Sequence, residues 1–128
     1  MAHPCERVLV VDDDADTREA ITMLLESEGI DVVAAEAAVA LNALREGYVP
    51  NVVVLDLIMP QVSGRTFRAR MKLDPRLRDI PVVLCTGSPQ LAREEDDFAA
   101  VIAKPFDPDA FFEALAALCM KSPRQRAS

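Results

Sequence analysis

The sequence RVLVVDDDAD, residues 7–16, is the clearest indication of the fold. A short apolar run that does not alternate with polar residues ends directly at three consecutive aspartates, and a fourth follows at Asp16. Such a run is typical of a parallel strand that is covered on both faces. Two carboxylates about 4 Å apart repel each other by roughly 4 kcal/mol at an effective dielectric constant of 20. The end of this strand therefore predicts either a cation or carboxylates that splay into water.

Four similar apolar runs follow and predict a five-stranded sheet. Besides residues 8–11, the expected strands are residues 32–35, 52–55, 82–85 and 99–103. Helical spacing of apolar residues predicts helices over residues 16–28, 37–46, 64–73 and 108–120. The segment 88–98 is poorly patterned, and we expect at most one or two turns of helix there. The alternation of strands and helices predicts an α/β fold with a doubly wound parallel sheet.

The composition of the 128 residues fits one domain with an aliphatic core, since 51% are hydrophobic and only 5% are aromatic. The net charge of −7 argues against a nucleic-acid partner and against adhesion to an anionic membrane. We find no signal segment or membrane span, so we expect a cytoplasmic protein. We expect residues 1–5 to be a flexible start, residues 6–120 the domain, and residues 121–128 a disordered basic tail.

The three cysteines, Cys5, Cys85 and Cys119, are scattered and odd in number. This pattern favours reduced thiols over a disulfide framework. Cys85 lies within an apolar run, which indicates a small core residue. The single histidine, His3, lies near the start of the chain, which argues against a histidine-based metal or catalytic site.

Polar residues follow four of the five apolar runs. Asp12 and Asp13 follow the first run, Asp56 the third, Thr86 the fourth and Lys104 the fifth. Ligands of open α/β sheets bind beyond the carboxyl ends of the strands, where these side chains would converge. Carboxylates suit a hard cation such as Mg²⁺. A carboxylate can also attack phosphorus to give an acyl phosphate, with the amine and the hydroxyl holding phosphoryl oxygens.

Taken singly, several of these residues have simpler interpretations. Asp14 and Asp16 are predicted to be charges at a helix N-terminus, and the DPD at 107–109 a helix cap. Thr86 fits an ordinary turn equally well, and Lys104 alone is more simply a surface lysine. The run REEDD at 93–97 is predicted to be a solvated face. Asp12 and Asp13 opposite Asp56 favour a site by themselves, whereas Thr86 and Lys104 are assigned to it only because they converge on the same edge.

Four pieces of the sequence, VLVVDDD, VVVLDLIMPQVSG, PVVLCTG and AKPF, are similar in order and spacing to receiver domains of two-component response regulators. The resemblance covers about residues 6–120. It implies a flavodoxin-like (βα)₅ fold with strand order 2-1-3-4-5, as in stand-alone chemotaxis receivers, and a cis bond between Lys104 and Pro105. It also implies these roles: Asp56 as phosphoacceptor; Asp12, Asp13, Asp56 and the Ile58 backbone carbonyl as ligands of Mg²⁺ or Mn²⁺; Thr86 and Lys104 as phosphate contacts.

The implied function is that of a receiver that accepts a phosphoryl group on Asp56 from a sensor histidine kinase or a histidine phosphotransfer protein. Such a domain signals through contacts with a downstream protein, here unknown, and a homodimer is left open. It promotes only its own phosphorylation and dephosphorylation, so we do not expect a conventional enzyme.

Two features depart from the family pattern. Lys104 follows Thr86 by 18 positions, roughly one helical turn (about 3.6 residues) less than is typical, which predicts a shortened fourth helix. Val101 stands where receivers usually carry an aromatic residue. A scaffold that works without phosphorylation is therefore an alternative. A measurement of Mg²⁺ affinity would distinguish it from a phosphorylated receiver, since a scaffold need not bind the metal ion. A dehalogenase-type phosphatase is disfavoured, because Ile58 stands where that class has its acid.

Overall fold

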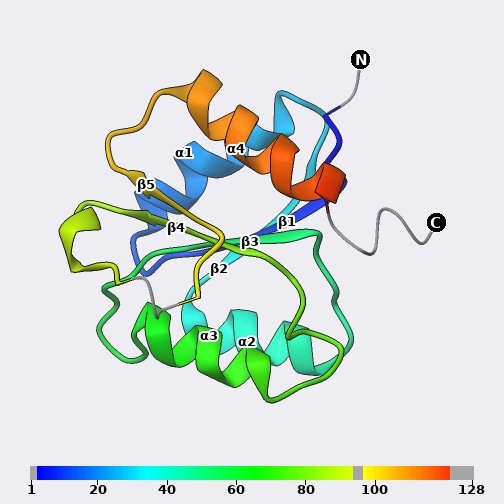
Figure 1. The fold of residues 1–128 in the computed structure, drawn as a ribbon, viewed down its shortest axis with the longest axis vertical. Helices are drawn as coiled ribbons and strands as arrows, with labels where there is room; N and C mark the ends of the chain where they lie inside the picture. Colours follow the sequence, from blue (N-terminus) through cyan, green and yellow to red (C-terminus); the bar gives the residue numbers. More distant parts are fainter. Residues whose placement is uncertain (1–2, 94–96, 122–128) are drawn as a thin grey trace.

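The structure, a computed structural model, describes residues 3–93 and 97–121. Strands and helices alternate along the chain (Figure 1). In order they are β1 (Arg7–Val11), α1 (Ala15–Glu26), β2 (Asp31–Ala35), α2 (Ala37–Arg45), β3 (Val52–Leu55), α3 (Gly64–Lys72), β4 (Val82–Thr86), the short 3₁₀ helix η1 (Pro89–Leu91), β5 (Ala100–Ala103) and α4 (Pro108–Lys121).

The strands form one parallel sheet in the order β2-β1-β3-β4-β5. Helices α2 and α3 cover one face of this sheet, and α1 and α4 cover the other (Figure 1). The predicted fold class and strand order are therefore confirmed. The Lys104–Pro105 peptide bond is cis, as the resemblance implied.

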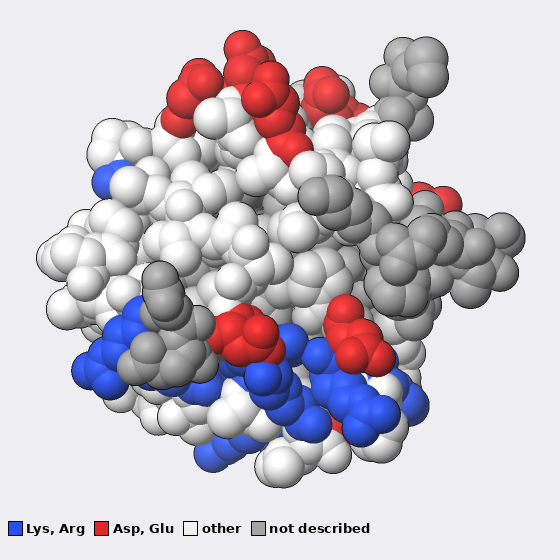
Figure 2. All heavy atoms as spheres, in the orientation of Figure 1, with Lys and Arg blue, Asp and Glu red and all other residues white. Residues whose placement is uncertain are grey.

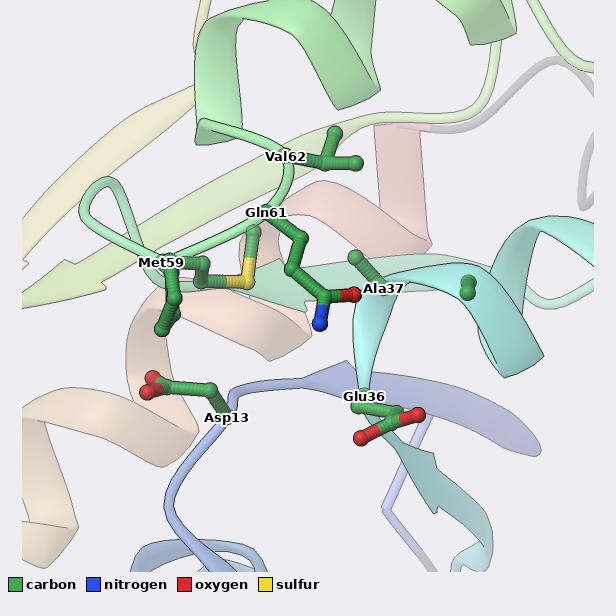
Figure 3. Close-up of a pocket in the computed structure, with 8 residues that line it drawn as sticks. Asp13, Glu36, Ala37, Met59, Gln61 and Val62 are labelled. Atoms are coloured by element: carbon green, nitrogen blue, oxygen red, sulfur yellow. The ribbon is translucent and has the colours of Figure 1, made fainter.

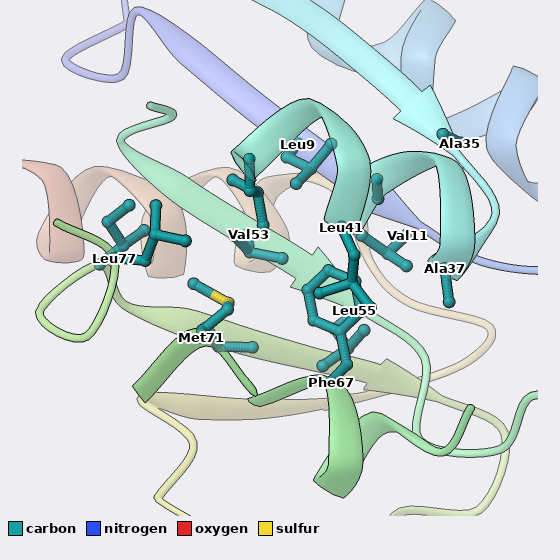
Figure 4. Close-up of a cluster of buried hydrophobic side chains, with 14 of the residues drawn as sticks. Leu9, Val11, Ala35, Ala37, Leu41, Val53, Leu55, Phe67, Met71 and Leu77 are labelled. Carbon is teal, nitrogen blue, oxygen red and sulfur yellow. The ribbon is translucent and has the colours of Figure 1, made fainter. Parts of the chain in front are cut away.

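The sheet is buried on both faces because successive side chains of a strand enter two different cores. Leu9 and Val11 of β1 pack in the cluster shared with α2 and α3 (Figure 4), whereas Val8 and Val10 pack in the cluster under α1 and α4. All four are at most 1% exposed. Burial of each such side chain contributes about 1.5–3 kcal/mol, which explains why residues 8–11 are all apolar.

Short acidic side chains cap the starts of α1 and α4, as predicted. The Asp14 carboxylate accepts a hydrogen bond from the backbone N–H of Asp16 at 3.2 Å, and the Asp107 carboxylate accepts one from the N–H of Ala110 at 3.2 Å. These bonds satisfy backbone donors that a helix start leaves unpaired. The first helix ends at Glu26, before Gly29 takes a left-handed conformation with φ of 77°.

The connection between β4 and β5 contains only the 3₁₀ turn η1 within the described residues, in line with the predicted shortening of the fourth helix. Residues 94–96 of the predicted solvated run lie outside the described residues. Asp97, the last residue of this run, also forms ion pairs: its carboxylate pairs with Lys72 and lies 3.4 Å from Arg68 Nη2. With little helix beside it, β5 leaves Val101 44% exposed.

The cysteine prediction is wrong for two of the three residues. Cys5 and Cys119 form a disulfide, with Cα atoms 5.4 Å apart. Their pairing has no local signal in the sequence, because 114 positions separate them. Helix α4 runs back across the sheet, so its C-terminal end reaches the start of β1 (Figure 1). Cys85 is buried and has a free thiol, as expected.

Residues 3–5 pack against α4. The His3 imidazole Nε2 is hydrogen-bonded to the backbone oxygen of Phe112 at 3.1 Å, and Cys5 is 2% exposed. Residues 1–2 of the expected flexible start, and residues 122–128 of the expected tail, lie outside the described residues. Among the described residues, no helix combines the length and the apolar character that crossing a membrane requires.

Candidate functional site

Three aspartates meet at the carboxyl ends of β1 and β3. Val11 and Leu55 are partners in the register of these neighbouring strands, so the residues that follow them, Asp12 and Asp56, lie side by side. One carboxylate oxygen from each of Asp12, Asp13 and Asp56 lies within 4.8 Å of the others. A cluster of oxygen ligands at this spacing suits a hard divalent cation.

Lys104 supplies the positive charge that this cluster needs. Its Nζ donates a hydrogen bond to Asp12 Oδ2 at 2.7 Å and lies 3.5 Å from Asp56 Oδ2. Burial of the ammonium group acts to lower the pKa of Lys104, but the hydrogen bond to Asp12 and the charges of Asp12 and Asp56 outweigh it and raise that pKa. Lys104 is therefore protonated at neutral pH and offsets part of the repulsion between the carboxylates.

The carboxylates of Asp12 and Asp56 differ in how strongly they are held. Asp12 has a 4% exposed side chain; Oδ1 accepts the N–H of Asp14 at 3.0 Å and Oδ2 accepts from Lys104. Asp56 has a 14% exposed side chain; Oδ1 accepts only a long hydrogen bond of 3.4 Å from the N–H of Ile58. Asp56 is therefore the less engaged and more accessible of the two.

Thr86 ends β4 and is 1% exposed. Its Oγ1 accepts a hydrogen bond from the N–H of Ser88 at 3.1 Å, which is the turn that the sequence allowed as its simpler interpretation. The backbone oxygen of Thr86 accepts the N–H of Lys104 at 2.8 Å, which ties the ends of β4 and β5 together. In the described part of the chain, no hydrogen bond joins the Thr86 hydroxyl to any of the three carboxylates.

Two residues that shape the site carry no signal in a single sequence. Arg18 of α1 donates from Nη1 to the backbone oxygen of Asp12 at 2.7 Å and so holds the loop that carries Asp12 and Asp13. Gly64 begins α3 directly against the Asp56 backbone, where an added Cβ would lie 2.7 Å from the Asp56 carbonyl oxygen. The sequence placed Gly64 only at the start of a predicted helix.

A pocket of 240 Å³ opens beside Asp13. Figure 3 shows Asp13 and Glu36 on one side of it and Met59 and Val62 on the other, with Gln61 between them. The pocket lies between the loops after β1, β2 and β3, and Asp13 is the member of the acidic cluster that lines it.

Cys85 lies near the site but is no candidate nucleophile. Burial raises the pKa of its thiol to about 11, the charges of Asp12 and Asp56 add to this, and Lys104 acts in the opposite direction. A thiol with this pKa is protonated at neutral pH, and the protonated form is a poor nucleophile.

Comparisons with known proteins agree with this geometry. Residues 8–116 match the family described as Response regulator receiver domain. An uncharacterized 14.6 kDa protein of Leptolyngbya boryana is 33% identical over 123 residues, which cover 91% of this chain and 92% of that protein. The transcriptional regulator RpaA of Synechocystis is 31% identical over 92% of this chain, which spans only about half (51%) of that protein.

A similar solved structure is the receiver domain of the sensor histidine kinase PA1611 from Pseudomonas aeruginosa, which holds a magnesium ion in its active-site cleft. The TM-score is 0.82 at 19% identity, and the likeness covers 91% of this chain and 98% of that one. At this identity the likeness concerns the fold. With the match of residues 8–116 and the acidic cluster at the sheet edge, the chain belongs to the family of response regulator receiver domains.

Proposed function

We propose that the chain accepts a phosphoryl group on Asp56, with a divalent cation bound by the acidic cluster. The main evidence is that carboxylate oxygens of Asp12, Asp13 and Asp56 lie within 4.8 Å of one another. Lys104 is bound to Asp12 and lies close to Asp56. A turn with a purely structural role does not need three carboxylates so close together. A phosphoryl-transfer site needs both oxygen ligands for a metal ion and a nucleophile.

The donor set fits Mg²⁺ or Mn²⁺. All three side chains offer carboxylate oxygens, which these hard cations prefer, and no nitrogen or sulfur ligand competes within the cluster. Asp12 and Asp13 would hold the ion together with Asp56, and the backbone carbonyl of Ile58 is the proposed fourth protein ligand. The bound ion would neutralise charge on the incoming phosphoryl oxygens and on the carboxylates.

In the proposed reaction a carboxylate oxygen of Asp56 attacks phosphorus. The bond between phosphorus and the imidazole nitrogen of a phosphohistidine breaks, the leaving imidazole takes a proton from solvent, and an aspartyl phosphate forms. The long hydrogen bond to Asp56 leaves this carboxylate free to attack. Lys104 would move its hydrogen bond from Asp12 to a phosphoryl oxygen, and the Thr86 hydroxyl would donate to another.

The proposed donor is a sensor histidine kinase or a histidine phosphotransfer protein. Receiver domains take phosphoryl groups from histidine kinases as a family, whereas the phosphotransfer protein, an unknown downstream protein and a homodimer are proposals for this chain.

The intact mass of the protein after incubation with phosphoramidate tests this function. With Mg²⁺ we expect an increase of one phosphate in the native protein. No increase is expected without Mg²⁺, in Asp56→Asn, or in Asp13→Asn, which loses a metal ligand but keeps the nucleophile. An equal increase in native protein and Asp56→Asn would place the phosphoryl group elsewhere and refute the proposal.

A scaffold that works without phosphorylation is the second candidate. It is favoured by the short β4–β5 connection and by Val101, which is 44% exposed where receivers usually carry an aromatic residue. Calorimetric titration with Mg²⁺ separates the two functions, since a scaffold has no need of the ion. Absence of Mg²⁺ binding together with absence of phosphorylation would favour the scaffold.

A further inference from the structure

The basic residues of this acidic chain are concentrated on one face. Although the net charge is −7, six of the 14 Lys and Arg residues fall within residues 65–78, which contain only one acidic residue, Asp74. Figure 2 shows Lys and Arg gathered where Figure 1 places α2 and α3, whereas acidic residues gather at the opposite end, near α1 and α4. A local excess of one charge sign steers partners of the opposite sign.

Most of these cations are already engaged within the domain. Arg65 contacts the backbone oxygen of Leu91, the buried Arg68 holds the backbone oxygens of Arg78 and Ile80, and Lys72 pairs with Asp97. Arg76 binds Asp74 at 2.7 Å. By contrast, Arg70 and Arg78 of this region, and Arg45 of α2, are exposed and have no ion pair within the described residues.

Arg45 and Arg70 both line a groove of 510 Å³ between the C-terminal ends of α2 and α3. The buried side chains of Leu44, Met71 and Leu77 also line it. Leu73, which follows α3, lines the groove and is 84% exposed. The one carboxylate in the lining, that of Asp74, is already bound by Arg76. The groove therefore combines an apolar lining with two uncompensated cations.

We propose that this groove between α2 and α3, separate from the phosphorylation site, binds an acidic segment of a partner protein. A large apolar side chain of that segment would enter the groove, and flanking Asp or Glu residues would pair with Arg45 and Arg70. The chain's own last residues, KSPRQRAS, are an unsuitable occupant because they carry positive charge. The volume of 510 Å³ is large enough for one or two such side chains.

Selection from a random twelve-residue peptide display library tests the proposal. The native protein is the target, and Arg45→Glu/Arg70→Glu is the counter-target. We expect recovered peptides to share a Leu, Ile or Phe flanked by Asp or Glu. Synthetic copies should bind the native protein and compete with one another. Arg70→Glu should weaken binding roughly tenfold or more.

Arg78→Glu is the matched control, because Arg78 is an exposed arginine of the same basic region that does not line the groove. It should weaken binding much less than Arg70→Glu. Each variant should unfold in urea at the same midpoint as the native protein, which excludes a folding defect without relying on the site at Asp56.

Several outcomes would overturn the proposal. These are recovery of no peptide, recovery of peptides without acidic residues, or equal losses in Arg70→Glu and Arg78→Glu. A single-stranded oligonucleotide that binds more tightly than the peptides and competes with them would indicate a nucleic-acid surface instead. Self-association in sedimentation experiments that Arg70→Glu abolishes would indicate a second copy of the chain as occupant.

Discussion

Replacement of Lys104 by Met should destabilise the protein strongly, but only in the absence of Mg²⁺. Lys104 Nζ lies 2.7 Å from Asp12 Oδ2 and 3.5 Å from Asp56 Oδ2. At an effective dielectric constant of 20 the closer pair alone attracts by about 6 kcal/mol, and the burial of both groups offsets a large part of that. We expect a net loss of about 2–4 kcal/mol in the free energy of unfolding, because Asp12 is left buried without a counter-charge.

Urea unfolding of Lys104→Met, with and without 10 mM Mg²⁺, measures this effect. Bound Mg²⁺ would replace the missing positive charge, so the loss should shrink to below about 1 kcal/mol when the ion is present. Lys72→Met is the matched control. Its pair with Asp97 is exposed, with side-chain exposures of 45% and 55%, so it should cost at most about 1 kcal/mol whether or not Mg²⁺ is present.

Equal losses of unfolding free energy in Lys104→Met and Lys72→Met would contradict this prediction, because Lys104 would then contribute no more to stability than a surface lysine. A loss in Lys104→Met that Mg²⁺ leaves unchanged would also refute it, since lysine and metal ion would not be compensating the same carboxylates.

Three further predictions concern the disulfide, the backbone beside Asp56 and an ion pair. A thiol reagent at pH 8 should find no reactive thiol in the native protein, one (Cys85) after unfolding in urea, and three after unfolding and reduction. Reduction should lower the free energy of unfolding by about 4–5 kcal/mol, whereas three reactive thiols before reduction would exclude the Cys5–Cys119 bond. Gly64→Ala should lower the free energy of unfolding in urea by about 1–3 kcal/mol, because its added methyl group meets the Asp56 carbonyl. The methyl group of Gly87→Ala meets no atom within 4 Å, so equal losses in the two variants would contradict the contact at Gly64. The hydrogen bond and charge of Lys72 lower the pKa of Asp97, so Asp97→Asn should reduce the free energy of unfolding by at most about 1 kcal/mol at pH 7. This stability difference should vanish as the pH falls below the usual range of an aspartate carboxyl, because the native Asp97 then becomes protonated; a difference that persists at low pH would have another cause than this ion pair.

The sheet was predictable because its signal is local. Each apolar run reflects a strand whose alternate side chains enter two cores, as Val10 and Val11 do, so the runs coincide with the observed strands to within one residue at almost every end. Helix starts followed equally well from capping residues such as Asp14 and Asp107.

The candidate site was predictable to the extent that strand ends determine it. Asp12, Asp13, Asp56 and Lys104 are brought together, since each follows a strand of the same parallel sheet. The proposed role of Thr86 remains a prediction, because its hydroxyl accepts a hydrogen bond from Ser88 and does not touch the carboxylates.

Features that depend on distant segments carried no readable signal. The bond between Cys5 and Cys119 follows from the direction in which α4 crosses the sheet, which spacing along the chain does not show. The same is true of Arg18, whose hydrogen bond to the backbone of Asp12 depends on how α1 packs beside the loop. The contact between Gly64 and the Asp56 carbonyl likewise depends on the path of the loop after β3.

Trapping of the phosphorylated product with borohydride would show whether Asp56 itself receives the phosphoryl group. Borohydride reduces an aspartyl phosphate to homoserine, which peptide mass spectrometry then locates. After incubation with Mg²⁺ and phosphoramidate we predict homoserine at position 56 and aspartate at positions 12 and 13. Homoserine at position 12 or 13, or a phosphorylated protein that retains aspartate at position 56, would contradict the account.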